Sequence, residues 1–269
     1  MSRLQQRLNG LRHAGRKALV PFISAGDPSL AATVPVMHAL VDAGADVIEL
    51  GVPFSDPMAD GPVIQRSSER ALARGAGMAW VLETVSAFRQ RDAQTPVVLM
   101  GYLNPVEIRG ADGFAAAAAA AGVDGMLLVD LPPEEAESYQ AAFSQYGLAL
   151  ISLVSPTTPQ DRLERLCAQA QGYIYYVSYA GVTGASHLNV TDAAEHLIQV
   201  RARATVPVFA GFGIRDAHSA AAMAAHADGV VVGSALVSAM EQSADEDAAA
   251  ARASAFLRPL REALDGEPR

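Results

Sequence analysis

Eight short apolar runs recur along the sequence, and segments of helix length and mixed polarity separate them. The runs are residues 18–24, 47–50, 97–100, 126–129, 149–153, 173–178, 206–210 and 230–232. Parallel strands that are buried on both faces have this continuous apolar character, and their alternation with helical segments is typical of βα units. The pattern therefore predicts an α/β chain with a parallel sheet covered by helices.

The number of runs favours a closed (β/α)8 TIM barrel, a fold of about 250 residues. The chain has 269 residues and no linker or shift in composition, so we expect residues 1–269 to form a single barrel domain. Leu4, Leu8 and Leu11 form an i, i+4, i+7 stripe that predicts an extra N-terminal helix. The Ala- and acid-rich tail from Glu241 predicts a C-terminal helical extension. An open doubly wound sheet remains the alternative, because periodicity does not show closure.

A four-residue pattern recurs where helices are expected to end and strands to begin. It reads Ala-Gly-Ala-Asp at 43–46, Ala-Gly-Val-Asp at 121–124 and Ala-His-Ala-Asp at 225–228. Glycine suits a left-handed position after a helix, so Gly44 and Gly122 fit that role. His226 stands in the same place at the third site, where the repeat is imperfect.

The charge and the cysteine content exclude several classes of protein. Lys+Arg is 20 and Asp+Glu is 29, which gives a net charge of −9. An acidic chain without a basic run is a poor ligand for nucleic acid or an anionic membrane. A single cysteine, Cys167, allows no internal disulfide and fits a reducing compartment. No apolar stretch has the length of a signal peptide core or a membrane span, so we expect a cytoplasmic protein.

Three further kinds of site are also disfavoured: a Schiff-base lysine, a metal site and a dinucleotide-binding site. The chain has one lysine, Lys17, just before the first predicted strand and thus at the rim opposite the barrel mouth, whereas a Schiff-base aldolase needs a lysine in its site. None of the six histidines has a metal-ligand spacing, and no GxGxxG follows a strand. We therefore predict no metal and no cofactor in this chain.

Glu49 is the first candidate for catalysis. It lies within an apolar strand, Val-Ile-Glu-Leu-Gly at 47–51, and either face of a barrel strand would bury it. A buried, unpaired carboxylate is costly and has a raised pKa, which suits acid–base chemistry. A structural ion pair inside the barrel is an equally good interpretation of this segment by itself.

The loop after this strand, residues 51–62, contains three prolines, two glycines and two aspartates. Proline fixes φ and glycine allows positive φ, so the composition predicts a shaped loop. Such a loop could present Asp60 over the barrel mouth near Glu49. The more ordinary role for Asp56 or Asp60 is to form a turn or to cap the next helix.

Glycine-rich turns follow three consecutive strands and indicate a phosphate site. They lie at residues 180–185, 211–214 and 233–235, and the last opens a helix. Backbone N–H groups in such turns can bind phosphate without lysine or arginine, and barrels often bind phosphate after strands seven and eight.

Four segments together resemble the tryptophan synthase α chain family, in order from about residue 4 to about residue 240. They read PFISAGDP at 21–28, ELGVPFSDPMADGP at 49–62, GVTG at 181–184 and GFGI at 211–214. The second segment is long and highly specific. The resemblance implies a lyase that cleaves indole-3-glycerol phosphate to indole and glyceraldehyde 3-phosphate in tryptophan biosynthesis.

The resemblance also implies roles for individual residues. Glu49 matches the general acid–base, and Asp60 matches the carboxylate that accepts the indole N–H. Asp56 and Thr183 match two mobile loops. The residues that match the phosphate site are Gly184, Gly213, Gly233 and Ser234. Those that match the indole slot are Phe22, Met100, Leu127, Tyr175 and Phe212, although apolar residues there often only fill the barrel.

The resemblance further implies a β-chain partner that carries pyridoxal phosphate, in an α2β2 complex. Gly101 and residues 185–187 depart from the common family pattern and bear on loop closure and partner contact. The alternatives are a stand-alone lyase, a weakly catalytic subunit that activates a β chain, and an isomerase or synthase on another phosphate-binding barrel. The last of these would lack the combined loop of residues 49–62.

Overall fold

The computed structural model describes residues 1–177 and 190–266, with the backbone alone for residues 190–194. Its parallel strands form a closed barrel in chain order, and β1 pairs with both β2 and β8. The strands are β1 (Ala18–Ser24), β2 (Ile48–Gly51), β3 (Val97–Gly101), β4 (Gly125–Leu128), β5 (Ala149–Val154), β6 (Ile174–Tyr176), β7 (Val208–Ala210) and β8 (Gly229–Val232). Closure confirms the predicted barrel and excludes the open sheet.

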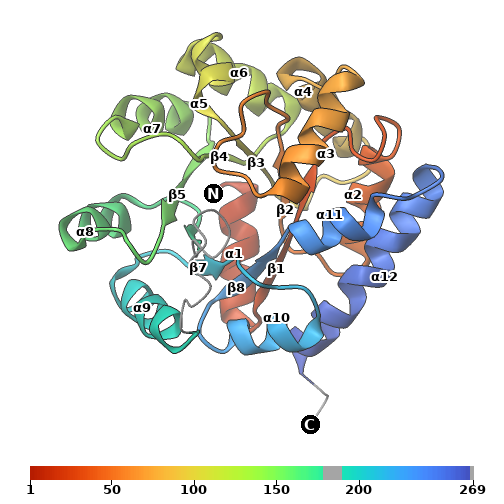
Figure 1. Cartoon of the computed structure of the whole chain (residues 1–269). Helices are drawn as coiled ribbons and strands as arrows, with labels where there is room; N and C mark the ends of the chain where they lie inside the picture. The colour runs from red at the N-terminus through yellow and green to blue at the C-terminus, as the bar shows by residue number, and fades with distance from the viewer. Residues whose placement is uncertain (178–189, 267–269) are drawn as a thin grey trace.

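The helices surround the barrel as an outer ring, except for α1, which lies in the middle of that ring in the view of Figure 1. Those before β5 are α1 (Arg3–His13), α2 (Thr33–Asp42), α3 (Pro62–Ala73), α4 (Met78–Arg89), α5 (Leu103–Glu107), α6 (Ala111–Ala121) and α7 (Ala136–Gln145). Those after it are α8 (Gln160–Gln169), α9 (Val190–Arg203), α10 (Ala217–Ala224), α11 (Ser234–Met240) and α12 (Glu246–Asp265). The alanine run at 115–121 is helical, as expected from the high helix propensity of alanine.

Alternate residues of each strand face the barrel interior and the helices. In β1, Val20 and Phe22 belong to the interior cluster, whereas Leu19 and Ile23 pack in the cluster beneath the helices. Both faces are buried, as a parallel sheet covered by helices requires. The apolar runs of the sequence therefore reflect two separate packing surfaces.

The predicted N-terminal helix is α1, and it covers the N-terminal end of the barrel. Its stripe of Leu4, Leu8 and Leu11 is buried against the interior cluster. Arg3 in this helix donates to the backbone carbonyls of Ala93 and Gly122, which precede β3 and β4. At the other end of the chain, α12 packs against α2 and α10 and forms the predicted helical extension.

The recurring Ala-x-x-Asp pattern places three aspartates at the N-terminal end of the barrel, where they make similar hydrogen bonds and ion pairs. In each copy the aspartate side chain accepts a backbone N–H from the first or second residue of a neighbouring strand. The pairs are Asp46 with Leu19, Asp124 with Val97, and Asp228 with Val208, at 3.0, 2.8 and 2.9 Å. Each aspartate also binds a guanidinium, from Arg261, Arg89 and Arg201 respectively. The three aspartates therefore join neighbouring strands where the strands begin.

The two glycines of this pattern have the expected backbone conformation. Gly44 has φ 100° and Gly122 has φ 89°, a region that other residues rarely adopt.

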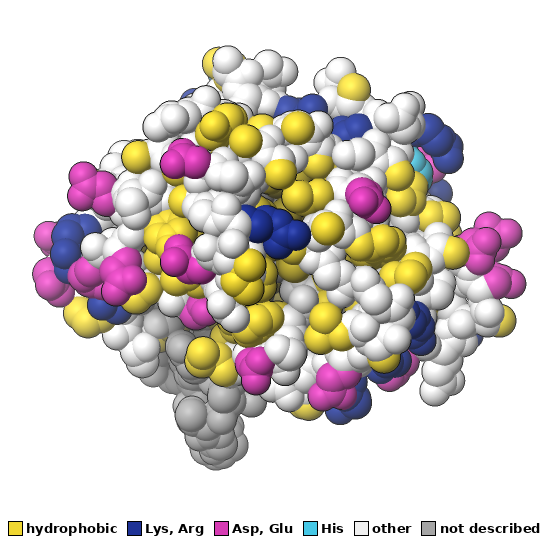
Figure 2. All heavy atoms as spheres, turned by 90° about the horizontal axis from the view of Figure 1, so that it is seen from above, with side chains coloured by type: hydrophobic (Ala, Val, Ile, Leu, Met, Phe, Trp, Pro, Cys, Tyr) yellow, Lys and Arg dark blue, Asp and Glu magenta, His cyan; other side chains and the backbone are white. Residues whose placement is uncertain are grey.

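On the side of the molecule shown in Figure 2, charged side chains of both signs are scattered among polar and hydrophobic ones. Among the described residues, no helix is both long enough and apolar enough to cross a membrane.

Candidate active site

Glu49 lies inside the barrel, in the middle of β2. It is in register with Phe22 of β1 and Val98 of β3, which both belong to the interior cluster. The side chain is completely buried. The alternation of the strand therefore places this carboxylate among the residues that fill the barrel.

No cation pairs with Glu49 in the part of the chain that the structure describes. Tyr173 donates its hydroxyl to Oε1 at 2.5 Å, and Oε2 has no hydrogen-bond partner among the described residues. Burial raises the pKa of Glu49 to about 7, against the smaller opposite effect of the Tyr173 hydrogen bond. No guanidinium or ammonium of the described residues pairs with Glu49, which argues against a structural ion pair. A carboxyl with this pKa can both give and take a proton near neutrality.

Asp60 belongs to the loop between β2 and α3. Gly61 is the N-cap residue of α3 and makes no side-chain cap, so Asp60 does not cap this helix. Tyr102 donates to Oδ2 of Asp60 at 3.1 Å and accepts the backbone N–H of Ala59 at 3.0 Å. The side-chain amide of Gln65 donates to the Asp60 carbonyl at 2.9 Å. These bonds give the loop the defined shape that its prolines and glycines predict.

The acidity of Asp60 also follows from its position. Burial raises the pKa of Asp60 to about 6, and the Tyr102 hydrogen bond opposes that rise. The carboxyl is therefore mostly ionised at neutral pH, with a tyrosine hydroxyl as its side-chain partner. An ionised carboxylate with spare lone pairs can accept a further N–H from a ligand.

Tyr175 stands within electrostatic range of both carboxylates. Burial raises the pKa of its hydroxyl, and the charges of Glu49 and Asp60 raise that pKa further. The Tyr175 hydroxyl donates to the carbonyl of Gly211 at 3.3 Å. A Cβ at Gly211 would lie 2.2 Å from the Tyr175 oxygen, so the close approach of ring and backbone requires glycine here.

The sequence analysis assigned no role to Tyr102 or Tyr173, and it placed Gly211 only within a glycine-rich turn of the expected phosphate site. Tyr173 had a usable signal, because it precedes Tyr175 by two residues and so shares its interior face. Tyr102 follows the end of β3, where functional residues of barrels gather. The packing of Gly211 on Tyr175 had no local signal in the sequence.

Four of the five residues expected to line the indole slot lie together. Phe22, Met100, Leu127 and Tyr175 share the interior cluster. Phe212 instead packs against the cluster outside β6 and β7, with its ring 6.2 Å from that of Tyr176. The structure thus does not bring Phe212 to the other four.

The cavity at the slot is small. Phe22, Met100, Asp60 and Tyr102 are among its lining residues, and it offers only about 10 Å³. That space is close to the minimum for a single water molecule. A ring of indole size would need the lining side chains to move.

Three of the four residues expected to bind phosphate, Gly213, Gly233 and Ser234, lie in the described part of the chain. Gly213 has φ 65°, and Gly233 precedes Ser234 at the start of α11. The backbone N–H groups of Gly213 and Ser234 donate to no described residue. Thr183 and Gly184 lie outside the described residues. Asp56 is exposed and accepts the Ser55 hydroxyl at 2.5 Å.

Other chemistries find little support at this site. Lys17 directly precedes β1 and donates to the Ala227 carbonyl at the N-terminal end of the barrel, whereas Glu49 lies within β2. Among the described residues, no group of three or more His, Cys, Asp and Glu could hold a metal ion. Two carboxylates in an apolar setting are the reactive groups that remain.

Comparison with known proteins identifies the family of this chain. The family model of the tryptophan synthase alpha chain matches residues 8–265. The tryptophan synthase alpha chain of Xanthomonas oryzae pv. oryzae is 70% identical over 266 residues, which cover 98% of this chain and 99% of the relative. The crystal structure of tryptophan synthase subunit alpha from Legionella pneumophila is similar with a TM-score of 0.92 at 45% identity, and the match covers 98% of this chain and 99% of that one. A structure of tryptophan synthase from M. tuberculosis in its aminoacrylate-bound form has a TM-score of 0.86 at 36% identity, with coverage of 98% and 100%. The chain therefore belongs to the tryptophan synthase alpha chain family.

Proposed function

We propose that this chain is a lyase that cleaves indole-3-glycerol phosphate to indole and glyceraldehyde 3-phosphate, with Glu49 and Asp60 as its catalytic residues. The observation that carries this proposal is that two carboxylates lie near the same tyrosine, Tyr175. Glu49 is fully buried, and one of its oxygens has no partner among the described residues. Asp60 is partly buried and accepts the Tyr102 hydroxyl. Family membership supplies the reaction. We further propose that residues 1–269 form one barrel domain.

The reaction is a retro-aldol cleavage that needs one proton delivered and one removed. The bond between indole C3 and the glycerol carbon becomes labile once C3 is protonated to the indolenine. In our proposal Glu49 gives that proton and then takes the proton of the adjacent glycerol hydroxyl. The hydroxyl oxygen becomes the aldehyde oxygen, the bonding electrons return to the indole ring, and Glu49 is regenerated as the acid. A pKa of about 7 suits both halves of this cycle.

In the proposed mechanism, Asp60 stabilises the positive charge that forms on the substrate. Positive charge develops on the indole nitrogen when C3 is protonated, and a carboxylate that accepts the N–H stabilises this charge. A pKa of about 6 keeps Asp60 mostly ionised at neutral pH. The Tyr102 hydrogen bond leaves lone pairs of the carboxylate available for the ligand.

The phosphate would anchor the substrate away from the reacting carbon. We assign this task to backbone N–H groups of Gly213, Gly233 and Ser234, and by resemblance to Gly184. Binding energy at a remote phosphate can hold the reacting atoms in place. Phe22, Met100, Leu127 and Tyr175 would contact the indole ring, with Phe212 reaching it only if its side chain moves. Asp56 and Thr183 would belong to loops that close over the substrate.

The family implies a partnership with a β chain. We propose an α2β2 complex in which the β chain receives indole and carries pyridoxal phosphate, while this chain works without a cofactor. The loops at the barrel mouth are the proposed contact surface. A biosynthetic enzyme of this kind is expected in the cytoplasm.

The first test is indole release from indole-3-glycerol phosphate by the purified chain, with and without a β chain. Slow release that the β chain strongly accelerates would support the proposal. Fast release by the chain alone would indicate a stand-alone lyase. Acceleration of the β reaction without measurable indole release would indicate a regulatory subunit, and no effect in either assay would refute the function.

A further inference from the structure

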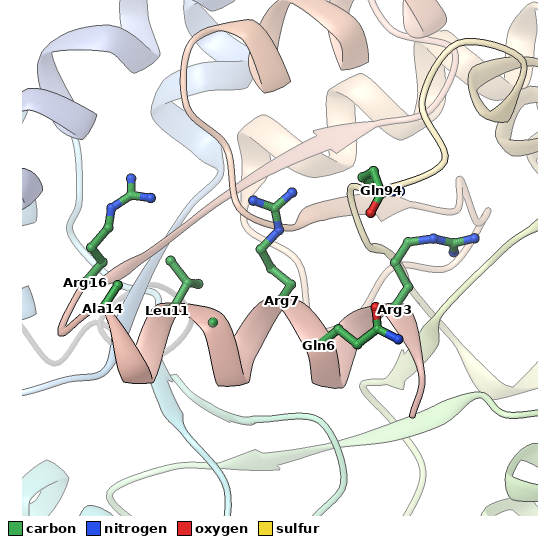
Figure 3. Close-up of a pocket in the computed structure, with 8 residues that line it drawn as sticks. Arg3, Gln6, Arg7, Leu11, Ala14, Arg16 and Gln94 are labelled. Atoms are coloured by element: carbon green, nitrogen blue, oxygen red, sulfur yellow. The ribbon is translucent and has the colours of Figure 1, made fainter.

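A second cavity lies at the opposite end of the barrel from Glu49, beside α1. It has a volume of about 300 Å³. Arg3, Arg7 and Arg16 line it, and their side chains rise from the same side of α1 and the residues just after it, with Gln94 across from them (Figure 3). The cavity has no role in the chemistry proposed above.

The shape of this cavity depends on two small residues, one within α1 and one at its C-cap. Gly10 and Ala14 lie between Arg7 and Arg16 on the same helical face and line the cavity. A Cβ at Gly10 would meet no atom within 4 Å. Glycine inside a helix costs about 0.5–1 kcal/mol relative to alanine. Glycine at position 10 therefore lowers the stability of the helix although packing does not require it. Because Gly10 has no side chain, the cavity stays open above this part of α1.

The lining of the cavity is positive. Three arginines and no acidic residue are among its lining residues. Arg3 is bound to the Ala93 carbonyl and to Asp124, and Arg16 is bound to Asp265. The aspartates that pair with the arginines therefore stand outside the cavity lining.

Arg7 differs from the other two arginines. Its nearest carboxylate oxygen, Oδ1 of Asp46, is 3.9 Å away, too far for a hydrogen bond. The other oxygen of Asp46 is occupied by the Leu19 N–H and by Arg261. The guanidinium of Arg7 makes no hydrogen bond with any described residue, although only 32% of its side chain is exposed. The side-chain amide of Gln94 makes none within the same part of the chain.

We propose that this cavity is a binding site for a small oxyanion with two or more negative charges, with Arg7 as its principal donor. The planar guanidinium offers paired N–H groups that match carboxylate and phosphate oxygens. Arg3 and Arg16 flank the ligand, and the Gln94 amide supplies a neutral donor. Inorganic phosphate is the simplest probe of this chemistry.

The test is a titration of the ¹⁵N-labelled full chain with inorganic phosphate at constant ionic strength. We expect the amide resonances of Gly10 and Ala14 to shift and saturate. Loss of a hydrogen bond to a charged group predicts that Arg7→Gln weakens this binding by about tenfold or more. Gly10→Leu fills this part of the cavity and abolishes binding without removing a charge. Arg12→Gln is the matched control, because Arg12 is an exposed arginine of the same helix that pairs with no described residue and lies outside the cavity lining. This variant should change the affinity less than twofold.

Phosphate at the barrel mouth is followed separately through the resonances of Gly213 and Gly233, which should respond alike in all four proteins. Failure of only those two resonances would count against the phosphate site of the proposed function and leave the present proposal supported. Absence of saturation at Gly10 and Ala14, or equal weakening by Arg7→Gln and Arg12→Gln, would overturn the present proposal and show only general screening of charge.

Discussion

The two ends of the barrel bury carboxylates in opposite ways. At the N-terminal end, Asp46 and Asp124 each accept a strand N–H and bind a guanidinium. Towards the C-terminal end, Glu49 and Asp60 have tyrosine hydroxyls as their side-chain partners and no cation among the described residues. A carboxylate buried without a cation destabilises a protein, so the contrast separates carboxylates that join neighbouring strands from carboxylates that we propose as catalytic. Barrels generally place stability at one end and function at the other.

The largest expected effect is on turnover after Glu49→Gln. Glutamine keeps the size of the side chain and removes its proton transfer, so kcat should fall by about 10²–10⁴-fold while phosphate ligands still bind. Indole release and ligand titration measure the two quantities. Glu69→Gln, on an exposed glutamate of α3 that forms no ion pair with any described residue, is the matched control. Turnover like that of the wild type in Glu49→Gln would remove Glu49 from the mechanism.

Asp124→Ala tests the other end of the barrel. The change leaves the buried Arg89 guanidinium without its carboxylate and the Val97 N–H without its acceptor, so stability should fall by about 3–5 kcal/mol. Urea unfolding measures the loss, and Asp112→Ala in an exposed part of α6 is the control. Activity per folded molecule should be nearly unchanged. A large drop in kcat with stability retained would contradict the division between the two ends.

Asp60→Asn should lower kcat by about 10²–10³-fold, since it removes the charge that stabilises the protonated indole. The asparagine can still accept the Tyr102 hydroxyl, so the loop should keep its shape. Steady-state kinetics separates the two parameters. An effect confined to KM would make Asp60 a residue for binding only.

Burial raises carboxylate pKa values at both ends, for Asp46 and Asp124 as well as for Glu49, but Glu49 has no cation among the described residues to offset the cost of ionisation. Burial raises the pKa of Glu49 from its ordinary 4.5 to about 7 in the folded chain, so the folded state holds more protons between these values. Glu49 therefore lowers stability as pH rises from about 4.5 to about 7, and the full penalty is present above that range. Glu49→Gln should raise the melting temperature at pH 8 and have less effect at pH 5. An equal effect at both pH values would show that ionisation of Glu49 carries no such cost.

The smallest effect concerns Tyr173, which holds Glu49 through one hydrogen bond. That bond favours the charged carboxylate, so Tyr173→Phe should raise the pKa of Glu49 further. The limb of the pH–rate profile that reports Glu49 should move to higher pH by about one unit. Tyr176→Phe, outside the barrel interior, serves as the comparison. An unshifted profile with lower kcat would give Tyr173 a purely structural part.

Much of the fold could be predicted from the sequence because its signals are local. The apolar runs and the helix-length segments give the order of elements, with β1 matching residues 18–24 in full. Boundaries elsewhere moved by one or two residues, as at β7, which begins at Val208. Gly44 and Gly122 marked helix ends correctly, since their φ values are a property of the backbone next to them. Burial of Glu49 followed from its strand.

The sequence by itself determined the elements, the burial of Glu49 and, through the 49–62 segment, the family. Only the tertiary structure decided that the sheet closes and that Glu49 has Tyr173, and no cation of the described residues, as its partner. It also decided that Asp60 is held by Tyr102 instead of capping α3, and that Phe212 packs away from the other four slot residues. The strand-start aspartates repeat visibly in the sequence, yet their arginine partners lie up to 215 residues away. Local backbone preference and side-chain periodicity act over a few residues, whereas hydrogen bonds and burial join residues that only the closed barrel brings together.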